Sequence, residues 1–226
     1  MKVFVYDDLD CYPIPSFLIE VSPYDLYKNW SAYQLMIKAD FELLFNKIQC
    51  YHGTKADPIS IQRDGLKILT LDKLEKMIID QVRNQGATDD EINQALNRPG
   101  YQMYKDIRSK NGMHSLCLHT SRKFALTDGC EFFKGSEFNR RFLDGLPRYK
   151  VLGIPLLIHC DIALEALEQD IWDRESVVAD YIFRALHYMN GELNISGSSE
   201  TTINFYKNGI PFEAVSEIEV INPCTP

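Results

Sequence analysis

The order of apolar and polar residues predicts both strands and helices along this chain. Residues 1–6 alternate as in a short strand, and Ser22-Pro23 precedes apolar residues that recur at helical intervals from Tyr24 to Met36. The apolar residues of 41–48 extend the same helical face, so we expect this helix to cover a core. A strand that begins at Cys50 should follow and end in an exposed corner.

The segment 71–96 has the pattern of two helices separated at Gln85-Gly86-Ala87. Thr88 and Glu91 have the spacing of a capping box, in which each side chain accepts a hydrogen bond from the other residue's backbone N–H. We interpret the segment of about 71–112 as a helical insertion.

Strands and helices also alternate in the second half of the chain. A strand at 115–121 leads into a helix from Ser121 to Phe133, and the almost continuous apolar run 151–162 is typical of a buried central strand. Pro155 predicts an irregularity in that strand. The remaining predicted elements are a helix over 163–189, a strand over 201–205 and a final strand over 217–221.

The composition is ordinary for one globular domain. The 226 residues are 45% hydrophobic and 25% charged, and we expect a single domain over 1–226 with a helical N-terminal extension over 1–48. The sequence contains no run of eighteen apolar residues, and its N-terminus lacks the pattern of a signal peptide. We therefore expect a cytoplasmic protein without a membrane partner.

The six cysteines are scattered without a Cys-x-x-Cys pair, which argues against a zinc knuckle and against a compact disulfide framework. We expect free thiols. Cys117 with His119, and His159 with Cys160, could supply ligands to one metal, but neither pair has metal-site spacing. We predict no metal site.

Charge is unevenly distributed. The net charge of −8 disfavours nonspecific binding to nucleic acid, but Arg98–Lys150 contains eleven Lys or Arg against five Asp or Glu. Two interpretations remain open for this basic stretch: a solvated face, or a patch that faces nucleic acid.

The most suggestive short motif is His52-Gly53-Thr54. Glycine has no Cβ, so a ligand can approach the backbone at Gly53, and the side chains on either side can hydrogen-bond hydroxyls or an amide. A histidine at a strand end is also compatible with an ordinary surface or core position, and the tripeptide alone does not decide between these.

The stretch Tyr51-His52-Gly53-Thr54, followed by Ile59 and by Gly65-Leu66, resembles the first strand and helix of ADP-ribosyltransferases, in particular the His-Tyr-Glu branch. It is more distantly similar to tRNA 2'-phosphotransferases. The resemblance implies that His52 and Thr54 bind the ribose hydroxyls of NAD and that the backbone of Gly53 holds the nicotinamide amide. Tyr51 would belong to the same NAD-binding segment.

Two later segments extend the resemblance. The strand 115–121 and its helix match the second strand of the superfamily, where an aromatic residue stacks on nicotinamide; Phe132 is our candidate, with Phe124 and Phe133 as alternatives and His119 close by. Glu200 stands where the catalytic glutamate of bacterial ADP-ribosyltransferase toxins precedes a strand, a turn and an Ile-Pro-Pro-like motif. Phe212 replaces the second proline of that motif.

Other carboxylates compete with Glu200. The Glu217-Ile218-Glu219 segment resembles the Glu-x-Glu of arginine-modifying transferases, and Glu213 lies inside the motif itself. We rank them below Glu200, because Glu213 has the context of a surface turn and the other two share one face of an edge strand.

The resemblance implies an α+β fold with a split, mostly antiparallel sheet and helical additions. It also implies an NAD-dependent mono-ADP-ribosyltransferase that acts as a bacterial or phage toxin or as a defence effector. Glu200 would stabilise the ribosyl cation and His52 would orient the ribose. NAD is then a substrate, the acceptor is a macromolecule with RNA or DNA slightly favoured, and an inhibitory antitoxin is an expected kind of partner.

Alternative functions use the same cleft. They are ADP-ribosyl transfer to a protein side chain, NAD hydrolysis, RNA 2'-phosphate transfer, and a binding module without activity. The phosphotransferase alternative is weakened because no Arg-His pair precedes Cys50.

Overall fold

A computed structural model describes residues 2–8, 21–22, 25, 28–110, 116–127, 133, 135–167, 202–205 and 209–222. The chain divides into two compact units. The first unit comprises Met1–Tyr51, Leu118–Phe124 and Cys160–Ile203, and the second comprises His52–Cys117, Ala125–His159 and Asn204–Pro226.

The strands form a mixed sheet. They are β1 (Lys2–Phe4), β2 (Phe45–Ala56), β3 (Leu116–His119), β4 (Ile154–Ala163), β5 (Thr202–Phe205) and β6 (Val215–Val220). Their order is β5-β3-β2-β4-β6, and β1 pairs with β2. The β1–β2 pair is parallel and the β2–β3 pair is antiparallel, with Tyr51 opposite His119. The described chain thus combines helices with a mixed sheet, which is compatible with the expected α+β class.

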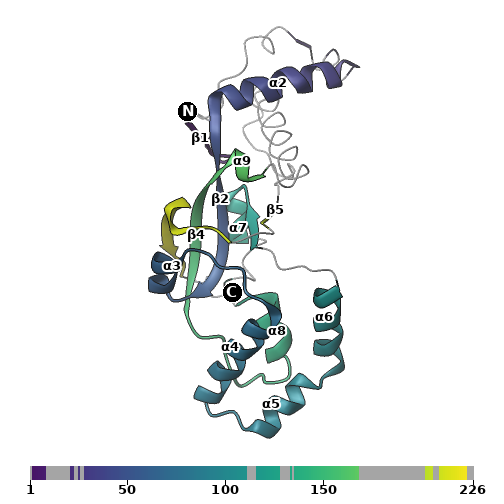
Figure 1. Ribbon diagram of the computed structural model, residues 1–226, viewed down its shortest axis with the longest axis vertical. Coiled ribbons are helices and arrows are strands. Elements are labelled where there is room, and N and C mark those ends of the chain that lie inside the picture. The colour runs from purple at the N-terminus through teal and green to yellow at the C-terminus, as the bar shows by residue number, and fades with distance from the viewer. Residues whose placement is uncertain are drawn as a thin grey trace. The chain divides into compact units, whose positions relative to one another are not determined.

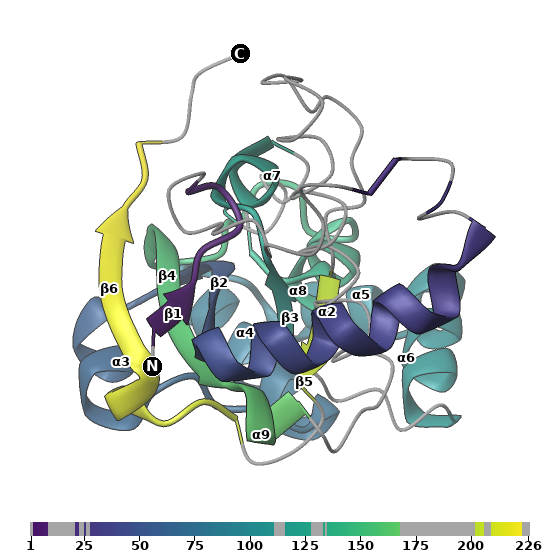
Figure 2. The same ribbon diagram turned by 90° about the horizontal axis from the view of Figure 1, so that it is seen from above.

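In the first unit, helix α2 (Trp30–Leu44) continues directly into β2, with β1 beside it (Figure 2). Phe4 of β1 lies 5.3 Å, between ring centroids, from both Phe41 of α2 and Phe45 of β2. All three rings are almost fully buried. This aromatic cluster fixes the junction between helix and strand. The unit also contains the short helix α9 (Leu164–Leu167).

Two predictions about this junction are wrong. The helix ends at Leu44, so residues 45–48 belong to β2 rather than to the helical extension 1–48. The helix also covers less core than expected, because Leu35 is 71% and Leu43 is 76% exposed while Phe41 is buried. The parallel pairing of Phe45–Ile48 with β1 explains the first error, since partners 43 or 44 residues away do not appear in a local apolar pattern.

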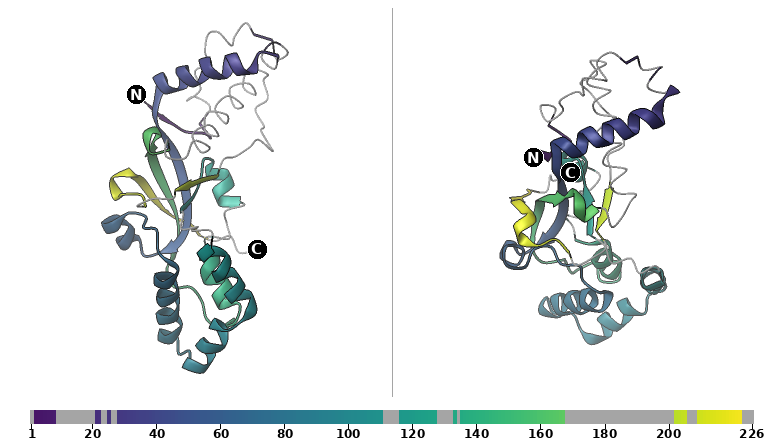
Figure 3. Two further views of the ribbon diagram at one scale, coloured as in Figure 1. Left: turned by 45° about the vertical axis from the view of Figure 1, so that its right-hand side comes forward. Right: turned by 45° about the horizontal axis from the view of Figure 1, so that its top comes forward.

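The second unit contains a helical bundle, formed by α4 (Leu71–Asn84), α5 (Asp89–Leu96), α6 (Pro99–Lys110) and α8 (Glu137–Leu143) (Figures 1 and 3). Thr88 and Glu91 form the predicted capping box of α5. The bundle packs around a buried apolar cluster that includes Ile78, Tyr101 and Phe142. The predicted helical character of 71–110 is therefore confirmed.

The same unit contains α3 (Pro58–Asp64) and the short 3-10 helix η4 (Phe212–Ala214). Gly65 ends α3 with a φ of 69°, and Leu66 and Ile210 exchange two backbone hydrogen bonds of 2.8 Å. A Cβ at Gly65 would lie 2.1 Å from the carbonyl oxygen of Ile210, so this position requires glycine. The Gly65-Leu66 pair singled out in the sequence therefore forms a turn, after which Leu66 makes an isolated antiparallel bridge to Ile210.

Candidate functional site

His52 lies inside a strand, not at a corner. Strand β2 continues past the His-Gly-Thr tripeptide to Ala56, and α3 begins only at Pro58. His52 and Thr54 are partly buried, and Gly53 is buried. The prediction of an exposed corner is therefore wrong, although the predicted order of strand, helix and Gly-Leu turn is confirmed.

One hydrogen bond determines the state of His52. Its Nδ1 lies 2.8 Å from the carbonyl oxygen of Cys117. A carbonyl can only accept, so Nδ1 carries the proton. Burial lowers the pKa of His52 below the ordinary 6.5, and the hydrogen bond to Cys117 partly opposes that shift. At neutral pH the ring is therefore neutral, with Nε2 as an acceptor for a ligand hydroxyl.

The neighbouring residues of β2 present different faces. Successive side chains of a strand point to opposite sides, so His52 and Thr54 share one face and Tyr51 takes the other. The Tyr51 hydroxyl donates to Gln49 Oε1 at 2.8 Å, and Gln49 lies 3.4 Å from the carboxylate of Asp161. Burial, with a contribution from Asp7, raises the pKa of Tyr51, so its hydroxyl stays protonated. The Tyr51 hydroxyl is thus a hydrogen-bond donor within the first unit, and a role of Tyr51 in binding NAD stays a prediction.

His119, at the end of β3, is buried and pairs in register with Tyr51. Its ring meets that of Phe124 edge to face, with centroids 5.1 Å apart. Phe124 belongs to α7 (Arg122–Thr127), which begins where the sequence predicts a helix. Phe124 is therefore one aromatic residue that contacts His119, and Phe133 is also buried. Because directly paired residues share a face, His119 lies on the face of Tyr51.

Asp7 stabilises the corner between β3 and α7, and sequence reasoning did not identify it. Its carboxylate accepts from Ser121 Oγ at 2.9 Å and from the backbone N–H of Arg122 at 2.5 Å. Ser121 Oγ in turn accepts from the N–H of Phe124 at 3.1 Å. Ser121 and Thr120 are fully buried polar residues. An acidic residue just after a strand was visible in the sequence, but not its distant partner.

The Glu-x-Glu segment contacts a histidine. His159 of β4 is 8% exposed; its Nε2 lies 3.2 Å from Glu219 and its Nδ1 lies 3.5 Å from Glu217. Strands β4 and β6 are neighbours in the sheet, and the backbone N–H of Ile221 donates to the carbonyl of Pro155 at 3.0 Å. Strand β6 is the last in the strand order, as predicted, but its glutamates are not simply solvated. Glu213 is an exposed residue of η4, as expected.

Two predicted site residues, Glu200 and Phe132, lie outside the described residues. Strand β5, predicted to follow Glu200, is present and neighbours β3 in the sheet. In the described part of the chain, no three His, Cys, Asp or Glu side chains are grouped so that they could hold a metal ion. Among the described residues, Cys50, Cys117 and Cys160 do not take part in disulfides. No helix within the described residues has the length and apolar character needed to cross a membrane.

The basic stretch contributes to ion pairs in the second unit. The pairs are Lys105–Glu75 at 2.7 Å, Arg108–Glu137 at 3.0 Å, Arg141–Glu137 at 3.6 Å and Arg148–Glu91 at 2.5 Å. Two of the three acidic partners, Glu75 and Glu91, lie outside Arg98–Lys150. The count of charged residues within that stretch therefore overstates the positive charge that it carries in the folded protein. Four basic side chains are accordingly part of the structure of the bundle.

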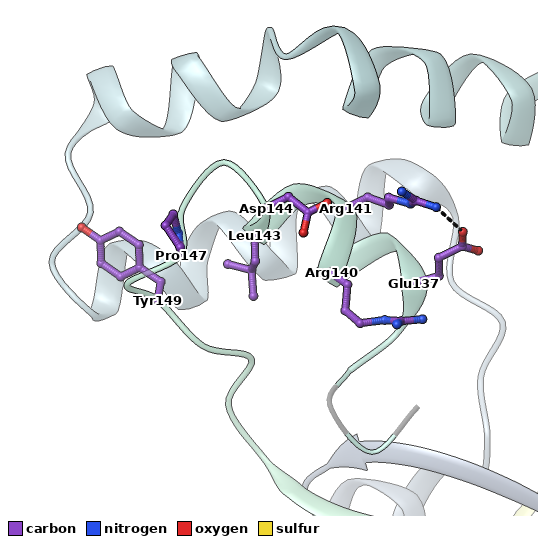
Figure 4. Close-up of a pocket in the computed structure, with 7 residues that line it drawn as sticks. All are labelled: Glu137, Arg140, Arg141, Leu143, Asp144, Pro147 and Tyr149. Carbon is purple, nitrogen blue, oxygen red and sulfur yellow. Dashed lines mark ion pairs between the residues drawn. The ribbon is translucent and has the colours of Figure 1, made fainter. Parts of the chain in front are cut away.

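A hollow of about 630 Å³ lies beside α8. Arg140, Arg141, Glu137 and Asp144 line it together with Tyr149, and Figure 4 shows Arg141 reaching toward Glu137. Its two cations and two carboxylates are balanced, so the hollow has no clear preference for an anionic ligand.

Family models, curated proteins and solved structures were compared with the chain, and none of them matches. Function must therefore be argued from the residues and their geometry.

Proposed function

We propose that the protein transfers ADP-ribose from NAD to a macromolecular acceptor. The observation that carries the proposal is the state of His52: a neutral ring, held by the carbonyl of Cys117 on Nδ1, that offers Nε2 to a hydroxyl. Among the residues described, His52 makes no further hydrogen bond. A ribose 2'- or 3'-hydroxyl of NAD is a suitable donor to this nitrogen.

The strand order supports the proposal. Strand β3 lies between β2, which carries His52, and β5, which Glu200 precedes in the sequence. The buried glycine next to His52 provides backbone groups without a Cβ, as binding an amide would require. We assign ribose binding to His52 and Thr54, and stabilisation of positive charge to Glu200.

In the proposed reaction, the bond between ribose C1' and the nicotinamide nitrogen breaks, and its electron pair leaves with nicotinamide, which becomes neutral. The ribose passes through a cation-like state that a carboxylate at Glu200 stabilises. A nucleophile of the acceptor then bonds to C1' and loses its proton to Glu200 or to solvent. No general acid is needed for the neutral leaving group.

The acceptor class is decided by experiment. The basic stretch favoured RNA or DNA, but four of its cations are engaged in ion pairs, which lowers that preference. Adenylate-labelled NAD should be incubated with the protein and with RNA, DNA or lysate protein, alongside His52→Ala and Glu200→Gln variants. We expect label in one macromolecular fraction and at least about a tenfold loss in both variants.

Other outcomes separate the alternatives. Free ADP-ribose without labelled macromolecule would identify an NAD glycohydrolase. Transfer that persists in both variants would contradict the assigned site. No consumption of NAD with any acceptor would overturn the proposed function and leave a binding role.

A further inference from the structure

Strand β6 (yellow in Figure 2) is the last strand of the sheet order and lies beside β4. Ile221 follows β6 directly, and its backbone N–H donates to the carbonyl of Pro155 on β4. In a strand, the backbone N–H and C=O groups of one residue point to one side, and those of the next residue point to the other. The backbone groups of Val220, and of Ile218 two positions earlier, therefore point away from β4.

The outward edge of β6 presents donors and acceptors in the arrangement that another strand needs. Within the part of the chain that the structure describes, no strand lies beyond β6, and no loop or turn hydrogen-bonds to the backbone of Ile218 or Val220. The strand contains neither proline nor lysine, two residues that commonly protect an exposed edge from pairing. Its backbone is thus suited to pair with a further strand.

The two faces of β6 carry different side chains. Glu217 and Glu219 contact His159 on one face, and the side chain of Glu217 is 62% exposed. Ile218 and Val220 lie on the other face, where Val220 is 58% exposed. A strand added at this edge would meet carboxylates on one face and β-branched apolar side chains on the other.

The charge of this edge selects its occupant. Between Asn208 and Pro226 the sequence contains three glutamates and no Lys or Arg. A second copy of β6, paired antiparallel about Ile218, would bring the glutamates of the two copies opposite each other, and like charges directly opposite destabilise a strand pair. Cationic side chains at the same positions would be attracted to them.

We propose that the outer edge of β6 binds an extended segment of a partner protein, which adds a strand to the sheet and alternates Lys or Arg with β-branched apolar residues. Main-chain hydrogen bonds with Ile218 and Val220 hold the segment, and Glu217 and Glu219 select it by charge. The surface belongs to the second unit and does not depend on the proposed transferase activity.

The first test measures binding of a model segment. A fluorescent peptide with blocked ends and the core sequence Lys-Val-Lys-Val-Lys is titrated with the full chain, and its anisotropy is followed. We expect saturable binding, and binding at least about tenfold weaker when Glu replaces Lys in the peptide. No saturation below about 1 mM protein would overturn the proposal.

Backbone methylation separates strand pairing from a purely electrostatic contact. Methyl groups on alternate amides block one edge of the peptide and leave the other edge intact. Of the two complementary methylated peptides, one should bind within about twofold of the unmodified peptide, and the other should bind at least about tenfold more weakly. Equal binding of both would contradict the addition of a strand.

A charge reversal on the protein tests the selection. Glu217→Lys should weaken binding of the lysine peptide at least about tenfold and should strengthen binding of the glutamate peptide. Glu213→Lys is the matched control, because it changes the net charge equally from an exposed position on η4, outside the strand. It should change binding by less than about twofold. Equal losses in the two variants would mean that the peptide responds to net charge alone.

The last variant blocks the edge itself. Val220→Pro removes one outward N–H and leaves the hydrogen bonds to β4, and proline is tolerated in an edge strand where the N–H faces solvent. It should abolish binding of the lysine peptide while circular dichroism shows a folded protein; full binding by the folded variant would overturn the proposal. Sedimentation tests the other occupant: self-association of the wild type that is lost in Val220→Pro would assign the edge to a second copy instead.

Discussion

The helical bundle and strand β2 use their polar side chains in different ways. In the bundle, Glu75 accepts from the neutral hydroxyl of Tyr101 and from the cationic Lys105, each at 2.7 Å. On β2, His52 is held by a neutral main-chain carbonyl and keeps an acceptor nitrogen. Complete internal pairing indicates a structural role, whereas a fixed ring with a remaining acceptor is suited to a ligand.

The same arrangement occurs three times in the bundle. Each set contains a tyrosine, a glutamate and a cation: Tyr101, Glu75 and Lys105; Tyr104, Glu137 and Arg108; Tyr149, Glu91 and Arg148. The first set joins α4 to α6, the second joins α6 to α8, and the third joins α5 to the segment that follows α8. Three of the eleven basic residues of 98–150 thus contribute to the packing of the second unit.

Removing the apolar centre of the bundle should have the largest effect on stability. Phe142 is fully buried and packs edge to face on Tyr101, with centroids 5.5 Å apart. Phe142→Ala should lower the free energy of unfolding by about 3–5 kcal/mol, because it leaves a cavity. Urea unfolding followed by circular dichroism measures this. Leu143→Ala, at a partly buried position of the same helix, should cost clearly less; equal losses would mean that the core is wrongly placed.

A smaller effect is expected from one hydrogen bond of the Tyr–Glu–cation sets. Tyr101→Phe keeps the buried ring and removes the 2.7 Å bond to Glu75, which should cost about 1 kcal/mol. Thermal unfolding compares it with Asp89→Asn, which breaks the exposed pair with Arg83 and should cost about 0.5 kcal/mol or less. A larger loss for Asp89→Asn would reverse our ranking of buried and exposed pairs.

The two regions also differ in how well the sequence predicts them. Helices α4 and α5, their break and the capping box at Thr88 depend on residues within one or two turns, so the local pattern is sufficient. The start of β2 at Phe45 depends on pairing with β1, and no local signal distinguishes that residue from a continued helix.

The candidate site shows the same limit. The motif at 52–54 could be found from its residues, but the Cys117 carbonyl that sets the tautomer of His52 is 65 residues away. The same is true of Asp7 with Ser121, and of His159 with Glu217. A motif names candidate groups, whereas their protonation and orientation depend on partners brought together by folding.

The pH dependence of the free energy of unfolding should show whether the His52 ring is neutral in the folded protein. We expect this effect to be the smallest of the three, because burial and the Cys117 hydrogen bond shift the pKa of His52 in opposite directions. The pKa of His52 in the folded protein lies below 6.5, so as the pH falls the unfolded chain takes up a proton at this residue more readily than the folded protein does. The contribution of the neutral His52 ring to the free energy of unfolding is thus complete above pH 6.5 and is lost as the pH falls toward the folded-state pKa. Urea unfolding at pH 7.5 and 5.5 measures this contribution. Between the two pH values, the wild type should lose more of its free energy of unfolding than His52→Gln does, since the other histidines are common to both proteins. A steeper loss in His52→Gln would mean that the folded protein favours a charged ring, and the assignment of Nε2 as an acceptor would then be wrong.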